Sequence, residues 1–209
     1  MNAHTKRIVR KILSPISRIG LKNRSFSIIS NNCWGGYVYD LFGLEYKTPT
    51  IGLYFFAKEF IKFISNLEYY LGIDAAPLDV NNSRYKDELL KRGHTMLGHV
   101  DDVEFVFIHY SSASQGCEKW NRRKNRVRFD NLLIKFNDQN LFSPSDYWAF
   151  RSLEFCNKLF FTANSSYANE AFSICFKEYK KAGFVADDIK TSKKHVNFKN
   201  LLNNLNGGK

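Results

Sequence analysis

Phe26-Ser-Ile-Ile-Ser-Asn-Asn-Cys-Trp-Gly-Gly36 is a short apolar, β-branched run followed by small polar residues, a tryptophan and two glycines. The apolar run predicts a buried strand, and the residues after it predict a tight exit into a loop. In open α/β sheets ligands bind at this carboxyl end of a strand, where backbone N–H groups are accessible. We therefore expect the following residues to contact a substrate: Asn31, Asn32, Trp34, Gly35 and Gly36.

Strand-like and helix-like segments alternate along the rest of the chain. Apolar or β-branched runs predict further strands at residues 50–56, 95–100, 103–110, 129–136 and 158–163. Amphipathic or capped runs predict helices at residues 37–42, 58–71, 113–126, 143–153 and 167–181. This alternation predicts an α/β fold, in which a mostly parallel, mixed sheet is flanked by helices.

The predicted elements belong to a single layered domain at residues 26–200. Asp101-Asp102 joins two of the expected strands and indicates a hairpin. Residues 74–91 are expected to form a polar loop. From residue 190 onward the chain is polar and weakly patterned, and residues 201–209 are expected to be a frayed tail.

Composition favours an anionic partner. The chain has 209 residues, a formal net charge of +11 and an isoelectric point near 9.5. This excess of positive charge is compatible with nucleic acid, phospholipid head groups or a phosphate-bearing substrate as the partner. The net charge alone does not distinguish these three partners. The four cysteines lack CxxC or metal-ligand spacing and no signal peptide is recognisable, which predicts free thiols in a reducing cytoplasm. No run approaches the roughly 20 apolar residues of a membrane-spanning helix.

Residues 1–25 form a basic arm, because the first acidic residue is Asp40. Apolar residues recur in the arm at three- and four-residue spacing, with an interruption at Pro15. Its basic residues are Lys6, Arg7, Arg10, Lys11, Arg18, Lys22 and Arg24. Such a segment predicts a peripheral position on an anionic membrane, at the inner face of the plasma membrane. The alternatives are a solubilising arm and a helix packed on the body.

Cys33 is the candidate nucleophile. His99 and His109 each lie at a predicted strand end, so either can act as its base. A thiolate beside a cation is the reactive form, and such a pair can carry acyl transfer through a thioester. Asp138 follows a strand and is the best placed carboxylate for acid/base chemistry. The alternative is structural, since free cysteine is among the most buried residue types.

The densest basic cluster of the chain follows Trp120. On a helix Arg122 and Arg126 share one face and can hold a diphosphate, with Lys135 at the rim of the site. Trp120 can pack or stack on a substrate, and the alternative for the arginines is a solvated helix face. Nucleic acid is disfavoured as a partner, because the basic residues do not interleave with aromatics as in RNA-binding strands.

The sequence carries no recognisable cofactor or metal motif. A Walker loop, GxGxxG, GxSxG and zinc-ligand spacing are all absent. Asp101-Asp102 superficially resembles the DxD element of metal-dependent glycosyltransferases, but its acids are adjacent. We therefore predict neither a cofactor nor a bound metal.

Five motifs together resemble a family of bacterial proteins commonly labelled exopolysaccharide-biosynthesis proteins. They are residues 31–36 (Asn-Asn-Cys-Trp-Gly-Gly), 50–54 (Thr-Ile-Gly-Leu-Tyr), 118–123 (Glu-Lys-Trp-Asn-Arg-Arg), 129–136 (Phe-Asp-Asn-Leu-Leu-Ile-Lys-Phe) and 161–163 (Phe-Thr-Ala). The resemblance runs over about residues 25–200, leaving out the basic arm. It implies a single α/β domain and a place in surface-glycan assembly, and it brings no catalytic residues.

These observations predict a transferase of bacterial surface-polysaccharide biosynthesis. The transferred group is glycosyl, acyl or phosphoryl, and the partner is a phosphate-bearing sugar donor or a lipid-linked glycan acceptor. The alternative is a non-catalytic glycan-binding or assembly protein that docks on lipid-linked intermediates.

Overall fold

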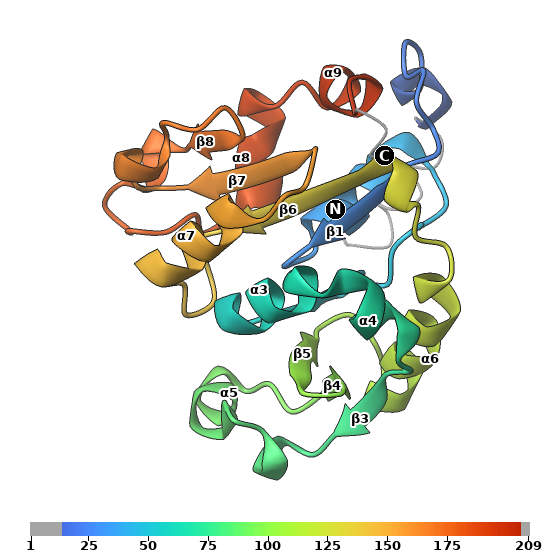
Figure 1. Ribbon diagram of the computed structural model, residues 1–209, viewed down its shortest axis with the longest axis vertical. Helices are drawn as coiled ribbons and strands as arrows, with labels where there is room; N and C mark the ends of the chain where they lie inside the picture. Colours follow the sequence, from blue (N-terminus) through green and yellow to red (C-terminus); the bar gives the residue numbers. More distant parts are fainter. Residues whose placement is uncertain (1–13, 206–209) are drawn as a thin grey trace, which may run out of the picture.

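A parallel sheet forms one half of the molecule. The computed structural model describes residues 14–205. In Figure 1 the sheet occupies the upper half, with strands in the order β1, β6, β7, β8. The bounds are β1 Ser27–Ser30, β6 Leu132–Asn137, β7 Lys158–Thr162 and β8 Ser173–Cys175. All three pairings are parallel, so the carboxyl ends of the strands meet at one edge of the sheet.

The second half is an antiparallel sheet, which is inserted between two neighbouring strands of the first. Its strand order is β2, β5, β4, β3, and the chain builds it after β1 and before β6. The bounds are β2 Leu53–Tyr54, β3 Ala76–Leu78, β4 Leu97–Val100 and β5 Val103–Phe107. β4 and β5 form the predicted hairpin, and Asp101 in its turn has a φ of 49°.

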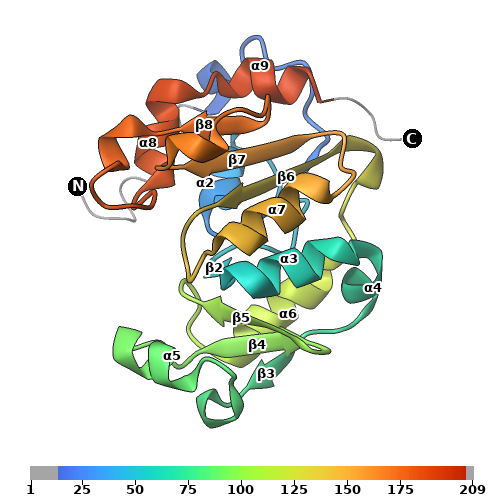
Figure 2. The same ribbon diagram turned by 60° about the vertical axis from the view of Figure 1, so that its left-hand side comes forward.

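Helices flank both sheets. The chain forms α2 Trp34–Phe42, α3 Ala57–Ser65, α4 Leu67–Gly72, α5 Lys86–Arg92, α6 Ala113–Lys124, α7 Pro144–Ser152, α8 Asp188–His195 and α9 Phe198–Asn203. Successive residues of β1 alternate between two cores: Ile28 packs with α2 and α9, and Ile29 packs with α3 and α7. α3 lies between the two sheets and buries Phe60 and Phe63 against both (Figures 1 and 2).

The α/β class predicted from the sequence is confirmed, whereas the single mixed sheet is wrong. Hairpin strands pair with each other across a tight turn and bury their own apolar face, here against α3 and α6. They therefore build a separate sheet and do not extend the parallel one.

Several predicted boundaries also change. The helix expected at residues 58–71 is two helices, because the backbone leaves helical geometry at Asn66 (φ −138°). The expected loop at residues 74–91 holds β3, a 3₁₀ turn at Val80–Asn82 and α5. The strand expected at residues 50–56 is shorter in the structure, where only β2 has strand geometry.

The helix predicted at residues 167–181 is wrong. The structure has 3₁₀ turns at Ser165–Tyr167 and Lys177–Tyr179, with the edge strand β8 between them. The backbone of β8 pairs with β7, and this long-range pairing outweighs the local helical pattern.

Both ends of the described chain lie on the body of the protein. The backbone N–H groups of Lys22 and Asn23 donate to Asn203 Oδ1 at 2.8 and 3.1 Å, and Leu202 is fully buried. The segment expected to be a frayed tail thus carries the end of α9, and residues 206–209 lie outside the described chain. Residues 1–13 of the basic arm also lie outside it. No helix within residues 14–205 has the length and apolar character to cross a bilayer.

Candidate functional site

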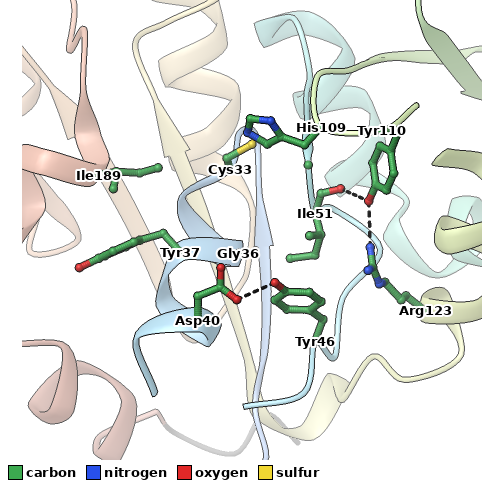
Figure 3. A pocket seen from close by; sticks show the side chains of 11 residues that line it. Cys33, Gly36, Tyr37, Asp40, Tyr46, Ile51, His109, Tyr110, Arg123 and Ile189 are labelled. Atoms are coloured by element: carbon green, nitrogen blue, oxygen red, sulfur yellow. Dashed lines mark hydrogen bonds between the residues drawn. The ribbon is translucent and has the colours of Figure 1, made fainter. Parts of the chain in front are cut away.

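A cavity of about 470 Å³ lies where the carboxyl end of β1 meets the antiparallel sheet. Figure 3 shows side chains that line it from α2, the segment after α2, the end of β5, α6 and α8. They are Cys33, Gly36, Tyr37, Asp40, Tyr46, Ile51, Gly52, His109, Tyr110, Arg123 and Ile189. Ligand pockets typically have volumes in this range and lie at such strand ends. We call this space the Arg123 cavity.

One face of α2 forms a wall of the cavity. Cys33, Gly36, Tyr37 and Asp40 follow the i, i+3, i+4, i+7 spacing of a single helix face. Gly36 permits this helix to pack closely, since a Cβ there would lie 3.3 Å from Ile51 Cδ1. The segment after β1, predicted as a tight exit into a loop, is the start of α2 and delivers side chains as well as backbone to the site.

The opposite wall is fixed by Gly52. Its φ of 70° favours glycine, and a Cβ there would approach the Tyr110 ring to 3.0 Å. Its carbonyl oxygen accepts hydrogen bonds from the N–H groups of Ile108 and His109 at 2.9 and 3.2 Å. These contacts hold His109 and Tyr110 at the cavity.

Cys33 lies at the start of α2 with a largely buried thiol. Its Sγ donates a weak hydrogen bond to Leu53 O at 3.7 Å. Burial, followed by the negative charge of Asp188, raises the pKa of the thiol to about 11. The thiol is therefore protonated near neutral pH. In Figure 3 the imidazole of His109 and the sulfur of Cys33 lie at the same end of the cavity.

Arg123 supplies a cation to the cavity. Its side chain is only 9% exposed; Nη1 donates to Tyr110 Oη at 2.9 Å, and the guanidinium lies 5.0 Å from the centre of the Tyr46 ring. Among residues 14–205, no carboxylate lies within ion-pairing distance of it. Asp40 is hydrogen bonded to the hydroxyl of that ring, since its Oδ1 accepts from Tyr46 Oη at 2.6 Å (Figure 3). The cavity thus presents a cation that neutral tyrosine groups hold in place.

A buried polar cluster lies beneath the site, at the carboxyl ends of β1 and β6. Lys135 is completely buried, and its Nζ is hydrogen bonded to Asp188 Oδ2 and, at 3.1 Å, to Asn32 Oδ1. Asn32 Nδ2 and Asn137 Nδ2 each donate to the same carboxylate at 2.8 Å. Burial lowers the pKa of Lys135, and Asp188 opposes that change. Every partner in this cluster comes from the protein, so the cluster fixes α8 over the strand ends.

Residues 4–206 match a family described as a domain of unknown function, DUF1919. This chain belongs to the DUF1919 family. The match extends into the basic arm, which the sequence resemblance left out. The DUF1919 chain is also similar to an uncharacterized protein of Haemophilus influenzae, 28% identical over 142 residues. That alignment covers 68% of this chain and 64% of the relative, so it spans less than two thirds of the relative's length.

The structure brings some of the predicted site residues together in the DUF1919 chain. Cys33, Gly36 and His109 line the Arg123 cavity. His99 does not, because it pairs with Glu104 near the start of β5, whereas His109 follows the end of that strand. Its Nδ1 is hydrogen bonded to Asp101 O in the hairpin turn.

Asp138 has a structural position. Its carboxylate accepts hydrogen bonds from the N–H groups of Ala163 and Val185 at 2.6 and 2.7 Å, and from Thr162 Oγ1 at 2.9 Å. Burial raises the pKa of Asp138, and these three donors oppose the rise. The residue links the exit of β7 to the segment before α8.

The two predicted tryptophans lie in the cores. Trp34 is fully buried and its Nε1 donates to Ser192 Oγ at 2.9 Å, while Trp120 stacks on Phe105 at a centroid distance of 4.4 Å. Gly35 packs on Ile28, where a Cβ would lie 3.1 Å from Cγ2. Packing therefore accounts for these three residues.

The remaining predicted residues divide between the polar cluster and the surface. Asn31 is buried beside that cluster, and its Nδ2 donates to Asn137 Oδ1 at 2.8 Å. Arg122 is exposed on α6, and Arg126 forms an ion pair with Glu45 at 2.7 Å. Neither arginine lines the cavity that Arg123 occupies.

Sequence reasoning missed eight residues that line the cavity, and five of these carry polar or charged side-chain groups: Tyr37, Asp40, Tyr46, Tyr110 and Arg123. For Tyr37 and Asp40 a signal was present, because the helix begins at Cys33 and their spacing from it marks one face. For Arg123 the basic run gave no signal, since only the packing of α6 decides which arginine turns inward.

Proposed function

We propose that this protein is a transferase that binds a phosphate-bearing sugar donor and acts in the assembly of bacterial surface polysaccharide. The observation that carries the proposal is Arg123, a buried cation at a cavity of about 470 Å³, with no carboxylate in ion-pairing distance among residues 14–205. A cation in that position attracts an anionic ligand, because burial makes its unneutralised charge unfavourable.

Phosphate fits the hydrogen-bonding geometry of this cation. The guanidinium has five N–H donors in a planar fork, and Tyr110 uses one of its terminal nitrogens, Nη1. The remaining donors can bind two oxygens of one phosphate. Asp40 and the ring of Tyr37 provide a hydroxyl acceptor and a stacking surface for the attached sugar.

The chemical step is assigned to the end of the cavity where Cys33 and His109 lie. A thiol with a pKa of about 11 is a hydrogen-bond donor at neutral pH, so a thioester route requires His109 to remove its proton. Histidine is the side chain most often used for such proton transfer. Glycosyl, acyl and phosphoryl transfer are each compatible with these two groups.

The polysaccharide context rests on the resemblance of residues 31–36, 50–54 and the three later motifs. In this proposal the reaction takes place in the cytoplasm or at the inner face of the plasma membrane, with the basic arm near anionic lipid.

A second candidate is a non-catalytic glycan-binding protein. One observation favours it: the raised pKa of Cys33 leaves the thiol without nucleophilic character at neutral pH.

Glycan analysis of a strain that lacks the gene distinguishes the two candidates. The strain is complemented with wild type, Arg123→Gln or Arg122→Gln, and thermal melts first establish that each variant folds. Arg122→Gln is the matched control, since it removes an exposed arginine from the same helix. We expect the Arg123→Gln strain alone to lack one sugar or substituent. If folded Arg123→Gln restores the full glycan, the transferase proposal fails.

A further inference from the structure

A smaller pocket of about 250 Å³ adjoins the Arg123 cavity. The two spaces share Cys33 and Ile189 as lining residues. Beyond these, the smaller pocket is lined chiefly by Asn32, Tyr54, Gln139, Asn140 and Asp187. We call it the Tyr54 pocket. A ligand there and a ligand in the Arg123 cavity would both contact these two side chains.

Tyr54 carries a hydroxyl group without a partner. The side chain is 6% exposed, and its Oη has no hydrogen bond among residues 14–205. Burial raises the pKa of Tyr54, and the nearby Arg92 guanidinium opposes the rise. Buried hydroxyl groups are nearly always hydrogen bonded, so an orphan in a pocket wall points to a partner supplied by a ligand.

The wall beside Tyr54 is fixed in an unfavourable conformation. Asn140 and Leu141 have φ values of 56° and 62°, which non-glycine residues seldom adopt. Asn140 is held by two contacts: its Oδ1 accepts from Arg92 Nη1 at 3.1 Å, and its backbone oxygen accepts from Ala57 N at 2.9 Å. Strained residues that are held this firmly concentrate at ligand sites.

The two spaces differ in charge. The Arg123 cavity contains a cation, whereas the residues that line the Tyr54 pocket include no lysine or arginine. Of the two acids in its wall, Asp188 is paired with Lys135 and Asp187 remains. A phosphate would meet no cation among these lining residues, while amide, carboxylate and phenol groups all hydrogen bond sugar hydroxyls.

The geometry points to the Tyr54 pocket as the binding site for the uncharged carbohydrate end of the acceptor. This inference rests on the proposed transferase function, because a transferase must hold a donor and an acceptor side by side. Cys33 and Ile189 then mark the place where the two substrates meet.

The test is a titration of ¹⁵N-labelled protein with a panel of neutral monosaccharides: glucose, galactose, mannose and N-acetylglucosamine. Wild type, Tyr54→Phe and Tyr69→Phe are compared, and inorganic pyrophosphate is titrated separately. Tyr69→Phe is the control, since it removes an exposed hydroxyl that bonds Asp101 at the hairpin. We expect at least one monosaccharide to shift the amide signals of Asn140 and Asp188 in the wild type.

Tyr54→Phe should lower the affinity for that monosaccharide about fivefold, which is the effect of losing one neutral hydrogen bond. The affinity for pyrophosphate should be unchanged. Its melting temperature should equal or exceed that of the wild type, because the variant removes an unsatisfied group. The acceptor site is refuted if no monosaccharide shifts these amides, or if folded Tyr54→Phe binds it as wild type does. If the wild type does not bind pyrophosphate, the donor site of the proposed function is refuted instead.

Discussion

Lys135 and Arg123 are both buried cations near the carboxyl end of β1, and their surroundings differ. Lys135 has no exposed surface and is neutralised by Asp188, with amide groups around the pair. Arg123 is 9% exposed, faces a cavity and is held by two tyrosines. The first charge is satisfied within the protein, and the second is satisfied only in part.

This difference separates a structural group from a binding group. A buried ion pair with complete hydrogen bonding holds elements together and has nothing left to offer a ligand. A buried cation without a carboxylate keeps donors available and stays unfavourable until an anion arrives. Burial and charge alone do not distinguish the two residues; their partners do.

The largest effect on stability is expected when the buried ion pair between Lys135 and Asp188 is broken. Lys135→Met leaves the Asp188 carboxylate buried without its cation, which should lower the free energy of unfolding by about 3–5 kcal/mol. Urea denaturation monitored by circular dichroism measures this change in the free energy of unfolding. Adding Asp188→Asn should recover part of the loss, since a neutral amide needs no cation. A loss near zero in Lys135→Met would contradict the role assigned to the cluster.

Cys33 lines the Arg123 cavity, and the charges of Asp188 and Lys135 both act on its thiol. Its pKa of about 11, against 9.0 for an ordinary thiol, leaves about 100-fold less thiolate at neutral pH. Iodoacetamide should therefore modify Cys33 far more slowly than the exposed Cys156, and the rate at Cys33 should rise with pH toward 11. Peptide mass spectrometry resolves the two sites. Fast modification at pH 7 would mean an activated thiol.

The smallest effect on stability and on anion binding is expected at Arg126. Arg126 pairs with Glu45 across partly exposed surface, with 31% and 67% of the two side chains accessible. Arg126→Gln should change the free energy of unfolding by less than about 1 kcal/mol and leave anion binding unchanged. Chemical denaturation and calorimetry check both values. A large loss of anion affinity would extend the site to the segment that follows α6.

Local patterns predicted much of this fold. The β-branched run at Ile28 and Ile29, the Asp101-Asp102 turn, and the start of α7 at Ser143 and Asp146 all appear, the last as a capping box. Each of these features depends on residues that are close together in the chain, so a local sequence pattern is enough to predict it.

The site was less predictable because it depends on distant pairing. Lys135 meets Asp188 across 53 residues, and β8 forms only because β7 offers an edge. From the sequence we expected Arg122 and Arg126 to bind phosphate, and these residues lie one position before and three positions after Arg123. No local rule selects among neighbouring arginines when tertiary packing decides which one is covered.

Calorimetric titration of inorganic pyrophosphate tests the central claim most directly. Wild type, Arg123→Gln and Arg122→Gln are compared at fixed ionic strength, after melts show that all three fold. Loss of a charge-assisted hydrogen bond should weaken binding by about tenfold or more in Arg123→Gln, with Arg122→Gln unchanged. Equal weakening in both variants would mean that pyrophosphate binds the basic surface, and the Arg123 cavity would not be the anion site.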